Sequence, residues 1–117
     1  MAVTVEKINK WAEKSKTKKI VKVLSNPNLE MRIAAIQALG TVDDEESLNT
    51  LIMVLRERDP VIRANAAEAL GNLGNLRAKE FVRKLSVNDE DENVREKALA
   101  AVNKLQEVQV EVEQEVK

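Results

Sequence analysis

Residues 59–71 read DPVIRANAAEALG, and this stretch occurs three times along the chain with variations. The related stretches are NLEMRIAAIQALG at 28–40 and DENVREKALAAVN at 91–103. In each stretch, an Asn or Asp is followed by Arg four positions later, by Ala seven and ten positions later, and then by Leu or Val. The chain is therefore built from a repeated unit of 31 to 32 residues.

Proline and glycine mark where these stretches begin and end. Pro27 and Pro60 each follow an Asn or Asp, which is typical of a capping residue followed by the first residue of a helix. Gly40, Gly71 and Gly74 come at or just after Ala-Leu pairs, where the end of a helix favours the left-handed conformation. Each stretch is therefore predicted to be a helix; the first two end at a glycine, and Asn103 replaces the glycine in the third.

A second helix is predicted in each repeat. Leu48, Leu51, Ile52 and Leu55 follow the i, i+3, i+4, i+7 spacing of one helical face, and Ala78, Phe81, Val82 and Leu85 repeat that spacing. The predicted second helices are 17–24, opened by Thr17 as a plausible cap, then 47–58 and 77–86. Residues 1–16, with Thr4 as a plausible cap, are predicted to form an N-terminal capping helix.

The end of the chain fits two conformations. Val108, Val110 and Val112 alternate with polar residues, which is the period of a strand. The same segment also carries a helical stripe of Leu105, Val108, Val112 and Val116, and we favour the helix because Glu, Gln and Lys surround it. Residues 106–117 are accordingly interpreted as an acidic C-terminal segment.

Composition excludes several classes of site. The 117 residues suffice for one domain, and they include neither Cys nor His, so disulfides, thiol nucleophiles, Cys or His zinc sites and Ser-His-Asp triads are ruled out. An EF-hand starting at Asp89 fails because Val94 and Ala100 stand where Gly and Glu are needed. We expect no cofactor and no metal. With no apolar run of about 20 residues and no secretory signal, we expect a cytoplasmic protein without membrane contact.

The repeated pattern resembles the short-period HEAT-like repeats found in phycobilin lyase subunits and in many small bacterial and archaeal proteins. The similarity covers residues 17–105 and is carried best by 31–40 and 61–74, where hydrophobic-Arg leads into Ala-Leu-Gly. The resemblance implies an all-α solenoid, in which about three helical hairpins stack because no pair buries its apolar side alone. It also implies that the second helices line a concave face.

The resemblance suggests a structural role for the repeated arginines Arg32, Arg63 and Arg95. In similar proteins this arginine pairs with an acidic or Asn residue of a neighbouring loop, and the candidates here are Asp59 and Asp91. We interpret the five residues as a structural ladder rather than as a basic binding stripe, because the arginine recurs at one repeat position. Two acidic runs, 43–46 and 89–92, precede helix starts, where negative charge is favourable.

Charge is distributed unevenly although the net charge is only −1. Residues 1–24 carry seven lysines and two glutamates, whereas residues 86–117 carry nine acids and four bases. The second helices together hold nine bases and two acids. We predict a shallow basic groove with Met53 at its apolar centre, and its contact residues are Lys18, Lys22, Met53, Arg56, Lys79, Arg83 and Lys84.

These features favour a non-enzymatic protein-binding scaffold that takes an acidic protein or peptide. The alternative is a nucleic-acid-binding module that uses the same basic face, with Trp11 or Phe81 as a stacking platform; the simpler interpretation of both aromatic residues is core or cap. The acidic segment Glu107–Glu115 of the same or another chain is a third candidate ligand. A homo-oligomer formed through the basic N-terminal and acidic C-terminal ends is also open.

Overall fold

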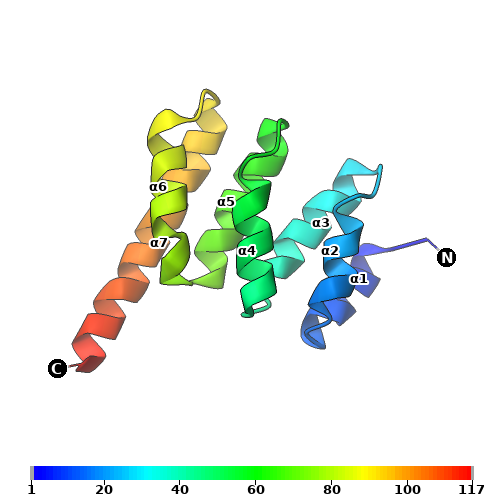
Figure 1. Cartoon of the computed structure of the whole chain (residues 1–117), viewed down its shortest axis with the longest axis horizontal. Coiled ribbons are helices and arrows are strands. Elements are labelled where there is room, and N and C mark those ends of the chain that lie inside the picture. The colour runs from blue at the N-terminus through cyan, green and yellow to red at the C-terminus, as the bar shows by residue number, and fades with distance from the viewer. Residues whose placement is uncertain (1, 117) are drawn as a thin grey trace.

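The computed structural model describes residues 2–116 of the chain, in which helices joined by short loops are present and no strand is. Figure 1 shows the helices in two rows, with α2, α4 and α6 in front of α1, α3, α5 and α7. Successive hairpins stack side by side, so the predicted all-α solenoid is confirmed. The elements are α1 Val5–Glu13, α2 Thr17–Val23, α3 Leu29–Leu39, α4 Glu45–Val54, α5 Pro60–Leu73, a 3-10 turn Leu76–Ala78, α6 Lys79–Asn88 and α7 Glu92–Val116.

Short polar side chains start most of these helices. The side chains of Thr4, Asn28, Asp44 and Asp59 each accept a hydrogen bond from a backbone N–H in the first turn of α1, α3, α4 and α5. Asp91 does the same at the start of α7, where its carboxylate accepts from the N–H of Val94 at 2.9 Å. Each cap satisfies a donor that the helix itself leaves free, which explains where the helices begin.

Two predicted helix starts are wrong in detail. Pro27 is not the first residue of α3, because the cap is Asn28, which follows it. Thr17 does not cap α2; it is the first helical residue, is buried, and donates its hydroxyl hydrogen to the carboxylate of Asp44 in the neighbouring hairpin. A threonine that ties two hairpins together has the same sequence signature as a cap.

Two of the three glycines serve close packing and do not adopt the left-handed conformation that was predicted for a helix end. Gly40 ends α3 with a right-handed φ of −67°, Gly71 lies inside α5, and only Gly74 adopts the predicted left-handed conformation, with φ +72°. A Cβ at Gly40 would lie 2.9 Å from the carbonyl oxygen of Ala69, and one at Gly71 would lie 2.9 Å from Cα of Ala101. These positions bring the backbones of α3, α5 and α7 together.

The core runs between the two rows. Its largest fully buried side chains come from every hairpin, and they are Ile8, Ile20, Ile36, Leu39, Leu48, Leu51, Leu70, Val82, Val94 and Leu105. A hollow that is open at the surface lies along the front row, between α4 and α6.

The last helix continues without a break to Val116, so the helical alternative for the C-terminal segment is correct and the strand alternative is wrong. Asn103 occupies the position on α7 that Gly40 and Gly71 occupy on α3 and α5, and it is exposed. No further helix of the described chain packs there, so a side chain larger than that of glycine fits at this position.

Candidate partner-binding groove

A groove of about 600 Å³ separates α4 from α6. It lies on the row of second helices, where the binding face was predicted from the sequence. Three of the seven predicted contact residues, Met53, Arg56 and Lys84, line it together. The remaining lining residues are Ile52, Leu55, Phe81, Leu85, Asn88 and Asp89.

The floor of the groove carries large apolar side chains that the fold leaves uncovered. Met53 is 70% exposed and Phe81 is 50% exposed, whereas Leu51 and Val82 beside them are fully buried. The interpretation of Phe81 as a core or cap residue is therefore wrong. Although its spacing matches the buried stripe, Phe81 lines the groove between α4 and α6 and stays half exposed.

Positive charge borders this apolar floor. Within residues 2–116, neither Arg56 nor Lys84 forms an ion pair, and both side chains are exposed. The one carboxylate at the groove, that of Asp89, is bound to Arg63. The free charge of the groove is therefore positive.

Asp89 is held ionised by its neighbours. Burial by itself would raise the pKa of this carboxyl group, but hydrogen bonds from Arg63 and from the N–H of Asp91, together with the charges of Arg63 and Arg95, lower the pKa below its usual value. Asp89 thus stays paired and does not offer a negative site to a ligand.

The other predicted contact residues lie elsewhere. Lys79 points to α7, where its ammonium donates to the side-chain oxygens of Gln106 and Gln109, and Arg83 pairs with Glu80 at 2.7 Å on its own helix. Lys18 lines a hollow that also contains Asp44 and Glu46. Lys22 lines a separate hollow beside Trp11, so it shares no groove with Met53 and Lys84.

The arginine ladder has a different acidic partner from the predicted ones. Arg63 is buried and donates to both carboxylate oxygens of Asp89, at 2.9 and 3.1 Å, and also to the carbonyls of Glu57 and Arg58. Asp59 and Asp91, the two candidates from sequence, instead accept backbone N–H groups as helix caps. Because the carboxylate of the cap Asp91 is directed at the backbone of α7, it cannot also bind Arg63. Asp89, two positions earlier, binds Arg63 instead.

The three arginines are not equivalent. Arg95 donates to the carbonyl of Asp89 at 2.6 Å, and the Nε of Arg32 is buried without a hydrogen-bond partner. Glu57 precedes the cap Asp59 by two positions, as Asp89 precedes the cap Asp91, but its longer side chain is exposed and forms no ion pair with Arg32.

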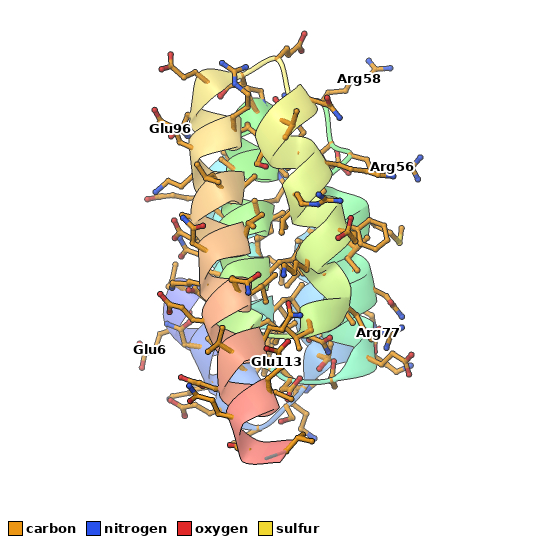
Figure 2. The ribbon with its side chains drawn as sticks, turned by 90° about the vertical axis from the view of Figure 1, so that its left-hand side faces the viewer. Glu6, Arg56, Arg58, Arg77, Glu96 and Glu113 are labelled. Carbon is orange, nitrogen blue, oxygen red and sulfur yellow. The ribbon has the colours of Figure 1, made fainter. Side chains whose placement is uncertain are left out.

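Charged side chains differ between the two rows. Figure 2 shows Arg56, Arg58 and Arg77 projecting from the side of α4 and α6, whereas Glu6 and Glu96 project from the side of α1 and α7. Arg77 is within 3.5 Å of Glu45, so part of this positive charge is compensated. The positive charges of the groove residues Arg56 and Lys84 are not compensated by an ion pair within residues 2–116.

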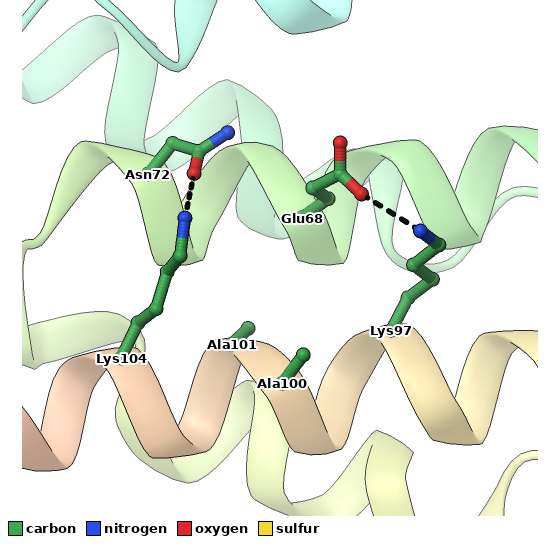
Figure 3. Close-up of a pocket in the computed structure, with 6 residues that line it drawn as sticks. All are labelled: Glu68, Asn72, Lys97, Ala100, Ala101 and Lys104. Carbon is green, nitrogen blue, oxygen red and sulfur yellow. Dashed lines mark hydrogen bonds and ion pairs between the residues drawn. The ribbon is translucent and has the colours of Figure 1, made fainter.

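A second hollow lies between α5 and α7, and polar side chains of these two helices bind each other across it. Figure 3 shows Lys97 paired with Glu68 at 3.1 Å and Lys104 bound to Asn72 across the small residues Ala100 and Ala101. Because its charged groups already have partners, this hollow is a weaker candidate than the α4–α6 groove. Residues 2–116 hold no cluster of Asp or Glu that could ligate a metal ion.

The repeat of Arg, Ala and Gly, and the stacking of hairpins through those small residues, match a known family model. The model for HEAT repeats matches residues 3–62 and 17–103. The chain belongs to the HEAT-repeat family. This match confirms the HEAT-like resemblance that the sequence predicted. HEAT repeats generally mediate protein–protein interaction or scaffolding.

Among solved structures, this HEAT-repeat chain is similar to an engineered protein whose crystal structure comes from the Northeast Structural Genomics Consortium. The two share 21% sequence identity with a TM-score of 0.63, over 90% of this chain and 51% of the engineered protein. The chain thus spans about half the length of that protein, and the likeness concerns the fold. No curated protein matches the sequence. In the part of the chain that the structure describes, no helix has the length and apolar character to cross a bilayer.

Proposed function

We propose that this HEAT-repeat chain is a non-enzymatic protein-binding module that takes an acidic protein or peptide segment in the groove between α4 and α6. The observation that carries the proposal is the pairing of exposed Met53 and Phe81 with the unpaired cations Arg56 and Lys84 around one groove. Apolar contacts at such a centre supply affinity, while the surrounding charges select an acidic partner and speed its encounter.

Capture of partners from an extract of the native host tests this proposal. The full chain is immobilised, and captured proteins are compared between the wild type and the Arg56→Glu, Lys84→Glu double variant. We expect the double variant to lose the partner. The matched control is Lys97→Glu on α7, which reverses a charge outside the groove and should keep the partner. Equal capture by the double variant would refute the groove as the site.

A nucleic-acid-binding module is the second candidate. It is favoured by Trp11, a half-buried ring with the ammonium of Lys19 5.9 Å from its centroid and Lys22 in the same hollow. Binding to phosphates would weaken steeply with salt, because it releases counterions. A gel shift with generic DNA and RNA at low and high salt separates the candidates, and the absence of a shift at low salt discards this one.

A further inference from the structure

The end of α7 has an apolar stripe that no part of the described chain covers. Leu105 is fully buried and Val108 is half-buried, but Val112 is 44% exposed and Val116 is 82% exposed along the same helical face. The stripe therefore continues after its neighbouring helices have ended. Exposed valines in a row at i, i+4 spacing are the pattern of a helix that packs against something.

Acidic residues flank this uncovered stripe. Glu111 and Glu115 precede Val112 and Val116 by one position each, so they lie along one edge of the stripe, and Glu113 lies near the other edge. None of these three glutamates forms an ion pair within residues 2–116. The α4–α6 groove has the complementary character, because exposed Met53 and Phe81 line it together with the unpaired cations Arg56 and Lys84.

We propose that the exposed C-terminal end of α7, residues 110–116, docks into the α4–α6 groove of a second copy of this chain. Val112 and Val116 contact Met53 and Phe81, while Glu111 and Glu115 face Arg56 and Lys84. This inference rests on the proposed function, because it names an occupant for the same groove. An external acidic partner would then compete with self-association.

The segment cannot reach the groove of its own chain. Lys79, the first residue of α6, is hydrogen-bonded to Gln106 and Gln109 of α7, whereas the groove is lined by later residues, from Phe81 on α6 to Asp89 in the loop after it. The last turns of α7 extend past the start of α6 and away from α4 (Figure 1). Docking must therefore take place between two molecules.

A second basic hollow, around Trp11, Lys19 and Lys22, is the alternative receptor for this segment. Trp11 is half-buried and already contacts Lys19, whereas Met53 is 70% exposed and Phe81 is 50% exposed. The exposed apolar area favours the α4–α6 groove, because removal of such area from water drives association.

Sedimentation velocity of the full chain over a wide concentration range tests the proposal. We expect concentration-dependent self-association that becomes at least about tenfold weaker in Val112→Asn, Val116→Asn and in Arg56→Glu, Lys84→Glu. Valine and asparagine have similar helix propensities, so α7 should persist. Val110→Asn is the matched control, because Val110 is also exposed but lies on the other side of α7. This control should leave the association unchanged.

An exchange of charges between the end of α7 and the groove is the decisive test. Glu111→Lys, Glu115→Lys should abolish self-association, and its combination with Arg56→Glu, Lys84→Glu in one chain should restore it. A chain that is monomeric at every concentration overturns the proposal, as does a failure of the charge exchange to restore association. Loss of association in Lys19→Glu, Lys22→Glu would assign the Trp11 hollow instead.

The two proposals fail in distinguishable ways. If the wild type stays monomeric but the groove variants lose an acidic partner from an extract, the proposed function stands and the self-docking is wrong. If the wild type self-associates through the groove but captures no other protein, the self-docking stands and the external partner is wrong.

Discussion

Arg63 and Asp89, 26 positions apart in the sequence, join α5 to the loop before α7 by two hydrogen bonds, at 2.9 and 3.1 Å. Both side chains are nearly buried, with 11% and 6% exposure. The same guanidinium also binds two backbone carbonyls of the loop before α5, so it links two successive loops. Removal of one member of such a buried pair leaves the other without compensation, which costs more than the pair contributes.

Asp89→Asn is expected to destabilise the chain by about 3 kcal/mol at neutral pH, because it leaves the buried Arg63 unpaired. The folded pKa of Asp89 lies below its unfolded value, so its stabilisation is complete above the unfolded value of about 4 and disappears as pH falls through the folded pKa. Urea unfolding at pH 7 and near pH 3 should show the gap between variant and wild type closing in acid. Asp43→Asn, an exposed control, should change little, and a gap that persists unchanged near pH 3 would contradict this account.

Glu57→Asp is expected to stabilise the chain by about 1 kcal/mol. The shorter carboxylate can accept from the N–H of Asp59, as Asp89 accepts from Asp91 at 2.9 Å and Asn26 accepts from Asn28 at 2.8 Å. It also brings a carboxylate toward Arg32, whose Nε is buried without a partner. The measurement is the free energy of unfolding. Glu57→Gln is the control, because the glutamine side chain has the same length as that of glutamate. The part of the gain that comes from the arginine should vanish when Arg32 is replaced by Met. A Glu57→Asp variant that is no more stable than the wild type would argue against equivalence of the loops.

Gly71→Ala is expected to destabilise the chain by about 1–3 kcal/mol, although alanine favours a helix more than glycine does. The added Cβ would meet Cα of Ala101 at 2.9 Å, so α5 and α7 must separate. The control is Asn103→Ala, at the equivalent position on α7, where no helix of the described chain packs and a slight gain is expected. Denaturant unfolding compares the two, and equal gains would contradict the role of Gly71 in helix packing.

Phe81→Ser is expected to cost less than about 1 kcal/mol, whereas Val82→Ala should cost about 2 kcal/mol. The two residues are adjacent, but Phe81 is half exposed in the groove and Val82 is fully buried. Thermal unfolding distinguishes the two variants. A large loss from Phe81→Ser would mean that this ring supports the fold rather than serving as a binding surface.

The repeat and its helices could be predicted from the sequence because they depend on local, periodic signals. The spacing of Arg, Ala and Gly gave the period, and Asp59 with Pro60 marked a helix start correctly. The net positive charge of the second helices also follows from the sequence, because the residues of one helical face are fixed by the turn of the helix. Met53, Arg56 and Lys84 line one groove, whereas the other four predicted contact residues lie elsewhere, and the role of these three residues in binding stays a prediction.

The tertiary structure decided which neighbours those residues meet. The sequence could not show that Arg63 takes Asp89 rather than Asp91, because the cap at Asp91 fixes which carboxylate is free to turn toward the arginine. Nor could it show that Gly40 and Gly71 serve close approach between helices, since a glycine at a helix end suits both roles. Phe81 has the spacing of a buried residue, and its exposure depends on the distance between α4 and α6. Periodicity is a property of one helix, whereas burial and pairing are set by the helices packed against it.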